Sequence, residues 1–301
     1  MPPRRGPRTV LLVLLLAVLC ACGSGTSDDR ATAEDTIRFA SYDFSENEIL
    51  AAVYAEAARR AGLPVSVQPR VGTREVVEPA LEQGVVDVVV DYLGTAVRFA
   101  GAAGPEEATP EQLQATLHAA LAPRGVEVLT AAAAEDQNGF AVSRAFAAEH
   151  GVSRLSDLAP IAAGLAFGGP PECPDRPLCL PGLSQVYGLT FGDVQNMPSR
   201  AATVEALLAG QIQVGLLETT DARLGSSPVV LLADDRSLQP RENVVPLVRS
   251  EVLERWGDPL REALEATSAR LTTADLIGLN RAVELEGLTP DAAAARWWDR
   301  G

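Results

Sequence analysis

Two stretches of this chain, residues 80–92 and 206–218, repeat one pattern at an offset of 126 residues. Each reads as the end of a helix, then a glycine (Gly84 or Gly210), then an apolar run that finishes in polar residues. A helix that leads into a buried strand is the repeating unit of open α/β sheets, which bind ligands beyond the carboxyl ends of their strands. The repeat therefore predicts two α/β lobes around a ligand cleft. The alternative is a chance match between two ordinary helix-to-strand crossovers.

The apolar run in the first copy and a later run both predict strands. Residues 85–90 are almost all apolar, which is typical of a parallel strand buried on both faces. Residues 244–248 predict another strand, interrupted by Pro246. Because proline cannot donate to a ladder, this strand is expected at an edge or in a hinge.

The order of the predicted elements indicates a clamshell. We expect residues 37–134 and 241–301 to form the first lobe and residues 135–240 the second. The chain then crosses twice between the lobes. Two crossings are the layout of a protein that closes on its ligand by hinge motion.

The first residues have the features of an export signal. Arg4, Arg5 and Arg8 precede an apolar run at residues 10–19. That run is too short to cross a bilayer as a stable helix, but it suits the core of a signal peptide. We therefore expect an exported protein.

The apolar run is followed by a sequence that resembles a bacterial lipobox. Residues 19–22 read Leu-Cys-Ala-Cys, with the small Ala21 directly before Cys22. This predicts a lipoprotein signal peptide over residues 1–22, acylation of Cys22, and a flexible tether over residues 23–36. The protein would then be anchored by lipid to the cell membrane and face the extracytoplasmic side. An ordinary secretory signal is the alternative.

Charge and histidine content exclude several classes of partner. The formal net charge is −15, and an acidic surface disfavours nucleic acid. The only histidines, His118 and His150, do not stand at the spacing of metal ligands. We expect no metal, no other cofactor and no nucleic-acid partner, and we expect a monomer.

Two cysteines outside the lipobox predict a small covalent loop. Cys173 and Cys179 enclose five residues in the exported part of the chain. Disulfides form and persist in oxidising compartments outside the cytoplasm. The short spacing therefore predicts a disulfide between them.

Five segments occur in the order and at the spacing of a known family. They are FGGPPECPDRPLCLPGLSQVYG at 167–188, GTREVVEPAL at 72–81, DYLGT at 91–95, TTD at 219–221 and NVVPLVR at 243–249. In this arrangement the chain resembles the substrate-binding proteins of osmoprotectant ABC importers. That family takes up glycine betaine, choline and related quaternary amines.

The resemblance implies a fold, a ligand class and partners. The fold would be that of type II periplasmic binding proteins, with no catalysis, and the partners would be a membrane permease with its ATPase. A quaternary ammonium has no N–H donor, so aromatic faces hold it by cation–π attraction. The carboxylate of a betaine needs an arginine fork or a helix N-terminus.

The resemblance also points to particular residues. Tyr92 matches a tyrosine of the family's ligand cage, and Arg176 matches an arginine that helps to grip the ligand carboxylate. Residues 42–45 occupy the first strand-to-helix loop, where family members also contact ligand. For Arg176, an ion pair with Glu172 or Asp175 is the alternative. The full set of candidate ligand-binding residues is Tyr42, Asp43, Phe44, Thr73, Tyr92, Thr95, Asn138, Glu172, Arg176, Glu218, Thr219 and Thr220.

The chain departs from the family at several cage positions. Tyrosines of the familiar cage align with Glu78, Val204 and Glu218, and a lysine common in the first loop is Tyr42 here. A different small polar or cationic solute therefore stays open as the ligand.

Other side chains could replace the missing part of the cage. Tyr42, Phe44 or Tyr187 could rebuild an aromatic wall, although Tyr187 suits packing better. Glu218 or Glu172 could instead attract a cation by charge.

Two other classes of function were weighed. Ser184, His150 and Asp157 occur in one region, but no G-x-S-x-G motif surrounds a serine, which argues against a hydrolase. A surface sensor that does not transport could use the same fold.

Overall fold

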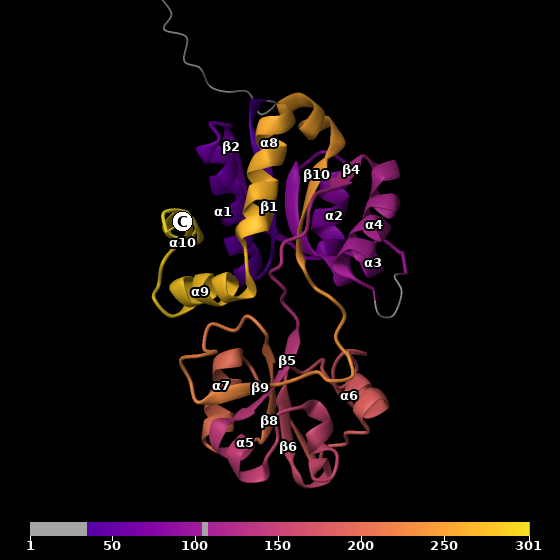
Figure 1. Cartoon of the computed structure of the whole chain (residues 1–301), viewed down its shortest axis with the longest axis vertical. Coiled ribbons are helices and arrows are strands. Elements are labelled where there is room, and N and C mark those ends of the chain that lie inside the picture. The colour runs from indigo at the N-terminus through magenta and orange to yellow at the C-terminus, as the bar shows by residue number, and fades with distance from the viewer. Residues whose placement is uncertain (1–34, 104–107, 301) are drawn as a thin grey trace, which may run out of the picture. The chain divides into compact units, whose positions relative to one another are not determined.

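The structure is a computed structural model that describes residues 35–103 and 108–300. The predicted signal peptide and Cys22 lie outside the described residues. The described residues form two mixed sheets of five strands each, and helices flank both sheets (Figure 1).

The first sheet has the strand order β2-β1-β3-β10-β4. Strand β1 is parallel to β2 and to β3, whereas β10 is antiparallel to both of its neighbours. The strands are β1 (Ile37–Tyr42), β2 (Val65–Gly72), β3 (Val88–Tyr92), β4 (Val126–Val128) and β10 (Val244–Arg249).

The second sheet has the order β7-β6-β8-β5-β9. Strand β6 is parallel to β7 and β8, and β5 is antiparallel to β8 and β9. The strands are β5 (Asn138–Ser143), β6 (Ala166–Gly169), β7 (Asp193–Asn196), β8 (Val214–Glu218) and β9 (Val229–Leu232). The helices associated with this sheet are α5 (Arg144–His150), α6 (Leu180–Tyr187) and α7 (Arg200–Leu208).

Alternating side chains of β3 explain why the first sheet is covered on both faces. Val88 and Val90 pack into one apolar cluster with α1, α8, α9 and α10, and Val89 packs into another with α2, α3 and α4. Figure 1 shows these two groups of helices on opposite sides of the sheet. The helices are α1 (Ser45–Arg60), α2 (Arg74–Glu82), α3 (Leu93–Phe99), α4 (Pro110–Leu121), α8 (Ser250–Arg270), α9 (Thr273–Glu284) and α10 (Pro290–Trp298).

The repeated sequence pattern corresponds to equivalent units in the two sheets, as predicted. Helix α2 leads through Gly84 into β3, and α7 leads through Gly210 into β8. Both glycines have left-handed backbones, with φ of +74° and +69°. Strands β3 and β8 each lie between one parallel and one antiparallel neighbour. The two copies therefore place Tyr92 and Glu218 at the same point of their sheets.

The prediction of a strand over residues 85–90 was wrong at its start. Strand β3 begins at Val88, and the side chain of Val85 is exposed. The backbone amides of Val85 and Val86 both donate to the carbonyl of Ala80. Val85 and Val86 therefore close the end of α2, and hydrogen bonding to β1 begins only at Asp87, whose amide donates to the carbonyl of Arg38.

The expectation that Pro246 marks an edge or hinge was also wrong. Strand β10 lies inside the sheet, between β3 and β4. The Pro246 carbonyl accepts from Leu129, which follows the last residue of β4. In an antiparallel strand the amide and carbonyl of one residue point to the same side. The side of Pro246 that lacks an N–H therefore faces a position beyond the end of β4. Few hydrogen bonds between β10 and β4 are lost because of the proline.

Two chain segments connect the sheets, as Figure 1 shows. Residues 129–137 lead from β4 to β5, and residues 233–243 lead from β9 to β10. An antiparallel bridge between Glu135 and Asn243 pairs the two segments. In the register, Val244 lies opposite Tyr92 in the first sheet and Asn138 lies opposite Glu218 in the second. The connections thus join the sheets at the strand ends that carry Tyr92 and Glu218.

Candidate functional site

Three aromatic rings gather at the carboxyl ends of β1 and β3. Tyr42 ends β1, Phe44 is the N-cap of α1, and Tyr92 ends β3. The ring of Phe44 stacks at 6.2 Å from that of Tyr42 and at 6.3 Å from that of Tyr92. Phe44 is 41% exposed, whereas both tyrosines are buried. We call these three residues the aromatic triad, and Phe44 gives it an accessible apolar surface.

Each tyrosine of the triad is fixed by a carboxyl group. The Tyr42 hydroxyl donates to Glu78 Oε1 at 2.6 Å, and the Tyr92 hydroxyl donates to Glu46 Oε1 at 2.7 Å. Burial and, after it, the nearby charge of Asp91 raise the pKa of Glu78 to about 8. Glu78 is therefore largely protonated at neutral pH. Glu78, which the sequence resemblance aligns with a cage tyrosine, accepts a hydrogen bond from the Tyr42 hydroxyl and so holds its ring in place.

An arginine already covers part of Tyr42. The Arg74 guanidinium lies 4.8 Å from the centre of the Tyr42 ring. It also binds Asp91 through two contacts, Nε to Oδ2 at 3.0 Å and Nη2 to Oδ1 at 2.5 Å. The Asp91 side chain is fully buried, so this pair is an internal part of the first sheet. A bidentate pair of this kind leaves Arg74 little capacity for a second anion.

Two carboxyl groups meet beside Tyr92. Glu46 accepts from Tyr92 and, at 2.6 Å, from the amide of Asn280, and it shares a hydrogen bond with Asp136. Asp136 also accepts from the Thr220 hydroxyl at 2.9 Å. Desolvation and the charge of Glu46 raise the pKa of Asp136 well above its usual range. Two carboxyl groups bond to each other only when one keeps its proton, so the pair carries about one negative charge.

Glu218 at the end of β8 forms an ion pair with the first residue of α7. The Arg200 guanidinium donates through Nε to Glu218 Oε2 at 2.5 Å and through Nη2 to Glu218 Oε1. Both side chains remain about one-third exposed. Glu218 also acts electrostatically on Asp136, which connects it to the carboxyl pair beside Tyr92. The charges of both sheets therefore interact at one place.

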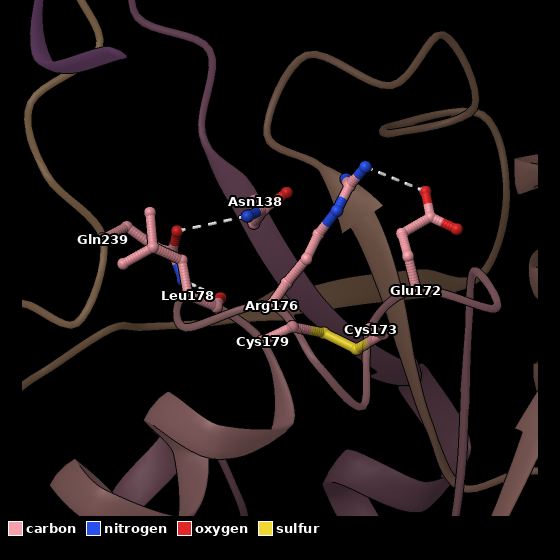
Figure 2. Close-up of a disulfide and its surroundings, with 7 residues drawn as sticks. All are labelled: Asn138, Glu172, Cys173, Arg176, Leu178, Cys179 and Gln239. Carbon is pink, nitrogen blue, oxygen red and sulfur yellow. Dashed lines mark hydrogen bonds and ion pairs between the residues drawn. A yellow bond between two sulfur atoms is a disulfide. The ribbon is translucent and has the colours of Figure 1, made fainter. Parts of the chain in front are cut away.

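Residues 173–179, the cysteine loop, make their contacts with residues outside the triad. Cys173 and Cys179 form a disulfide with a Cα–Cα distance of 5.3 Å (Figure 2). Arg176 in this loop pairs with Glu172 at 3.1 Å, and both side chains are exposed. Surface pairs of this kind contribute little to stability, so Arg176 is held only weakly.

The cysteine loop also contacts the chain segment that returns to the first sheet. The Gln239 amide donates to the carbonyl of Leu178 at 2.9 Å, and the Asn138 amide donates to Gln239 Oε1 at 3.4 Å (Figure 2). Asn138, a candidate ligand residue, is thus linked to the cysteine loop through Gln239.

The remaining candidates have identifiable structural partners. Thr219 donates its hydroxyl to Asp136 at 3.4 Å, next to Thr220. Asp43 pairs with Arg70 at the surface, and Thr95 donates to Glu242. Thr73 is the N-cap of α2. Tyr42, Phe44, Tyr92, Glu218, Thr219 and Thr220 therefore belong to one network, whereas the partners of Asp43, Thr73 and Thr95 lie outside it.

Neither Tyr187, an alternative for a rebuilt cage, nor Val204, which aligns with a cage tyrosine, joins this network. The Tyr187 side chain is buried in the core of the second sheet, and its hydroxyl donates to Asp234. Val204 is buried in the cluster between α7 and β8. Packing of these two residues leaves Tyr42 and Phe44 as the aromatic side chains that accompany Tyr92.

Comparison with known proteins identifies the family. Residues 35–300 match a family described as the substrate-binding domain of the ABC-type glycine betaine transport system. The chain belongs to this family. It is a solute-binding protein of ABC transport on the extracytoplasmic side, rather than an enzyme. This agrees with the resemblance drawn from the five sequence segments.

Individual relatives extend over nearly the whole chain. A glycine-betaine-binding protein of Pseudomonas aeruginosa is 29% identical and covers 93% of both chains. A carnitine transport binding protein of Listeria monocytogenes is 25% identical and covers 90% of this chain and 88% of its own. The crystal structure of a glycine betaine/carnitine/choline ABC transporter protein has a TM-score of 0.80 at 19% identity, covering 88% of this chain and 98% of that one. The predicted periplasmic-binding-protein fold with two α/β lobes is thereby confirmed.

No helix within residues 35–103 and 108–300 is long and apolar enough to cross a membrane. Within the same residues, no group of three or more His, Cys, Asp or Glu side chains is arranged to hold a metal ion.

Several members of the network escaped sequence reasoning. Glu46 and Asp136 look like ordinary polar residues of a helix start and a connecting segment. Arg200 and Asn280 lie on helices and are far from the recognised motifs. The only available signal was position: Glu46 stands two residues after Phe44, next to the first strand-to-helix loop, where ligand contacts were expected.

Proposed function

We propose that this protein is the receptor of an ABC importer and binds a small quaternary ammonium solute against the aromatic triad. The observation that carries the proposal is the exposed ring of Phe44, stacked between Tyr42 and Tyr92, with the carboxyl pair of Glu46 and Asp136 beside Tyr92. Aromatic faces attract a cation by about 0.5–2 kcal/mol each, depending on desolvation. A neighbouring negative charge adds Coulomb attraction that needs no hydrogen-bond donor on the ligand.

Residues from both sheets support a ligand held between the lobes. Asn280 of α9 donates to Glu46 and, at 3.0 Å, to the carbonyl of Thr220, which follows β8. Asp136 stands in one of the two connecting segments. A ligand at the triad would therefore touch elements whose relative position changes when the connecting segments bend. Closure of this kind would present a loaded receptor to the permease.

The ligand class is consistent with the relatives. The curated relatives quoted above are a glycine-betaine-binding and a carnitine transport binding protein, both at less than 30% identity. Their ligands share the quaternary ammonium group. This chain supplies aromatic rings and carboxylates for that group.

A lipid anchor is the proposed means of attachment to the membrane. It rests on the sequence around Cys22. A Cys22→Ala variant expressed in a bacterial host should move from the membrane fraction to the soluble exported fraction. Retention of the variant in the membrane would contradict acylation at Cys22.

The ligand class is tested by a melting screen of the purified protein. Ligand that binds only the native state raises the melting temperature by mass action. Tetramethylammonium, choline, glycine betaine and carnitine form the test set, with glycine and sorbitol as controls without a quaternary ammonium. We expect stabilisation by members of the first group only. Stabilisation by none of them, or by the controls alone, would overturn the proposed function.

A further inference from the structure

The charges around the triad nearly cancel in pairs and leave a negative remainder. Arg74 is matched by Asp91 and Arg200 by Glu218. A third arginine at these strand ends, Arg223, lies between two carboxylates, at 3.4 Å from Asp221 and 3.5 Å from Glu284. The carboxyl pair beside Tyr92 then adds about one negative charge, and among the described residues neither Glu46 nor Asp136 forms an ion pair with an arginine.

The sequence limits what else could receive a carboxylate. All 25 basic residues of the chain are arginines, because it contains no lysine. Helix α3 begins directly after Tyr92, but its first amides are occupied: Leu93 donates to Asn243, Gly94 to Arg241 and Thr95 to Glu242. The amide donors at the start of α3, which could bind an anion at this strand end, are therefore already engaged.

A buried acceptor beside the carboxyl pair has no donor. Asn280 is 4% exposed, and its Nδ2 donates to both Glu46 and the Thr220 carbonyl. These two acceptors fix the orientation of the amide. Its Oδ1 is buried and has no hydrogen-bond partner among the described residues. A hydroxyl group on a ligand could satisfy such an atom, whereas a carboxylate could not.

We infer that the site prefers a cation without a carboxylate, such as choline, over a zwitterion such as glycine betaine, and that the Arg200–Glu218 ion pair sets this preference. The inference rests on the proposed function and narrows its ligand class. A site with excess negative charge is brought closer to neutrality by a ligand of charge +1 but not by a zwitterion. The zwitterion's carboxylate would also lose water without gaining a donor from Arg74, Arg200 or the start of α3, which are already engaged. The preference would differ from the relatives named for glycine betaine and carnitine.

The role of the ion pair follows from its geometry. Glu218 occupies the Arg200 guanidinium through two hydrogen bonds, which are the contacts that a ligand carboxylate would otherwise make. Replacing Glu218 by the uncharged Gln keeps the size of the side chain but removes its charge. Arg200 would then be free to receive a carboxylate, and the site would lose one negative charge.

The test measures dissociation constants for choline and glycine betaine by titration calorimetry on the full chain. In the wild-type protein, choline should bind about tenfold or more tightly than glycine betaine. The Glu218→Gln variant should shift the ratio towards glycine betaine by about tenfold or more. The double variant Glu218→Gln/Arg200→Gln should lose this shift, since the guanidinium is gone. Glu286→Gln, which breaks a surface pair with Arg296, is the matched control and should leave the ratio unchanged.

Distinct results would overturn the inference. Glycine betaine binding as tightly as choline in the wild type would contradict it while leaving the proposed function intact. If that binding were lost in Arg176→Ala, the cysteine loop would be the carboxylate receptor instead. An unchanged ratio in a Glu218→Gln protein that melts normally would remove the role of the ion pair. Binding of neither ligand would overturn the inference together with the proposed function.

Discussion

Glu46 and Asp136 share a hydrogen bond, although one belongs to the first turn of α1 and the other to the segment that enters β5. The two carboxyl groups lie beside the hydroxyl of Tyr92, which donates to Glu46. One proton between them keeps the pair from carrying two charges. A bound cation would balance the second negative charge in place of the shared proton. Ligand and proton are therefore expected to compete for the pair.

This competition predicts that ligand binding releases protons. The pKa of Asp136 is raised in the free protein by desolvation and by Glu46, and a nearby cation favours the ionised form. Affinity should therefore rise with pH until the pair loses its shared proton without ligand. Calorimetric titration with choline in phosphate and in Tris, at one pH, should give enthalpies that differ by a fraction of one proton times the difference in buffer ionisation heat. Equal enthalpies in the two buffers would rule out the release.

Replacing Phe44 should reduce the affinity for ligand much more than it reduces the stability of the fold. Phe44→Ala removes the exposed ring between two tyrosines, and we expect the affinity for a quaternary ammonium to fall by about tenfold or more. Phe99 at the end of α3 is the matched control, because it is 40% exposed against 41% for Phe44. Phe99→Ala should leave the affinity unchanged. An equal loss in both variants would indicate a general effect rather than a ligand contact.

Glu78 should make stability fall as pH rises. Its pKa is about 8 in the folded protein, against an ordinary value of 4.5. The folded state therefore holds a proton that the unfolded state has lost between these two values, and its advantage declines with increasing pH. Glu78→Gln removes this decline while keeping an acceptor for Tyr42. We expect the variant to unfold at the same denaturant concentration as wild type near pH 4, and to gain on the order of 1–3 kcal/mol by pH 9. A difference that stays constant over this range would contradict the raised pKa.

The two glycines of the repeated pattern should differ in their tolerance of alanine. Both have positive φ, so Ala costs about 1–2 kcal/mol of backbone strain at either position. At Gly210 an added Cβ would meet nothing within 4 Å, whereas at Gly84 it would lie 2.6 Å from the Arg249 guanidinium. Arg249 would have to move away from Asp87 and Glu251. Urea unfolding should therefore show Gly84→Ala as the more destabilised variant, and the reverse order would count against this packing.

The repeated pattern predicted the fold well because it encodes a local rule. A helix end, a left-handed glycine and an apolar strand depend on neighbouring residues, and the structure has them at the same offset in β3 and β8. The position of β10 was not predictable in this way. Pro246 suggested an edge, but its cost depends on where β4 ends, and that is a non-local fact.

The site was predictable only in part, for a similar reason. Tyr42, Phe44 and Tyr92 stand at strand ends, a position that the sequence reveals. The electrostatic setting depends on pairings between distant residues, such as Asp136 with Glu46. The resemblance to the family leads one to expect an aromatic residue at position 218, where this chain has Glu218. That Glu218 pairs with Arg200 is visible only in the structure. The aromatic residues of the site could be predicted from the sequence, but the net charge around them could not.

The most direct test of the account compares choline with its neutral carbon isostere, 3,3-dimethylbutan-1-ol. The two molecules have nearly the same shape and hydroxyl group, but only choline is charged. If the aromatic triad and the carboxyl pair hold a cation, choline should bind about tenfold or more tightly in titration calorimetry. Equal binding of the two molecules would show that charge plays no part, and it would contradict the cation-binding role assigned to Tyr42, Phe44 and Tyr92.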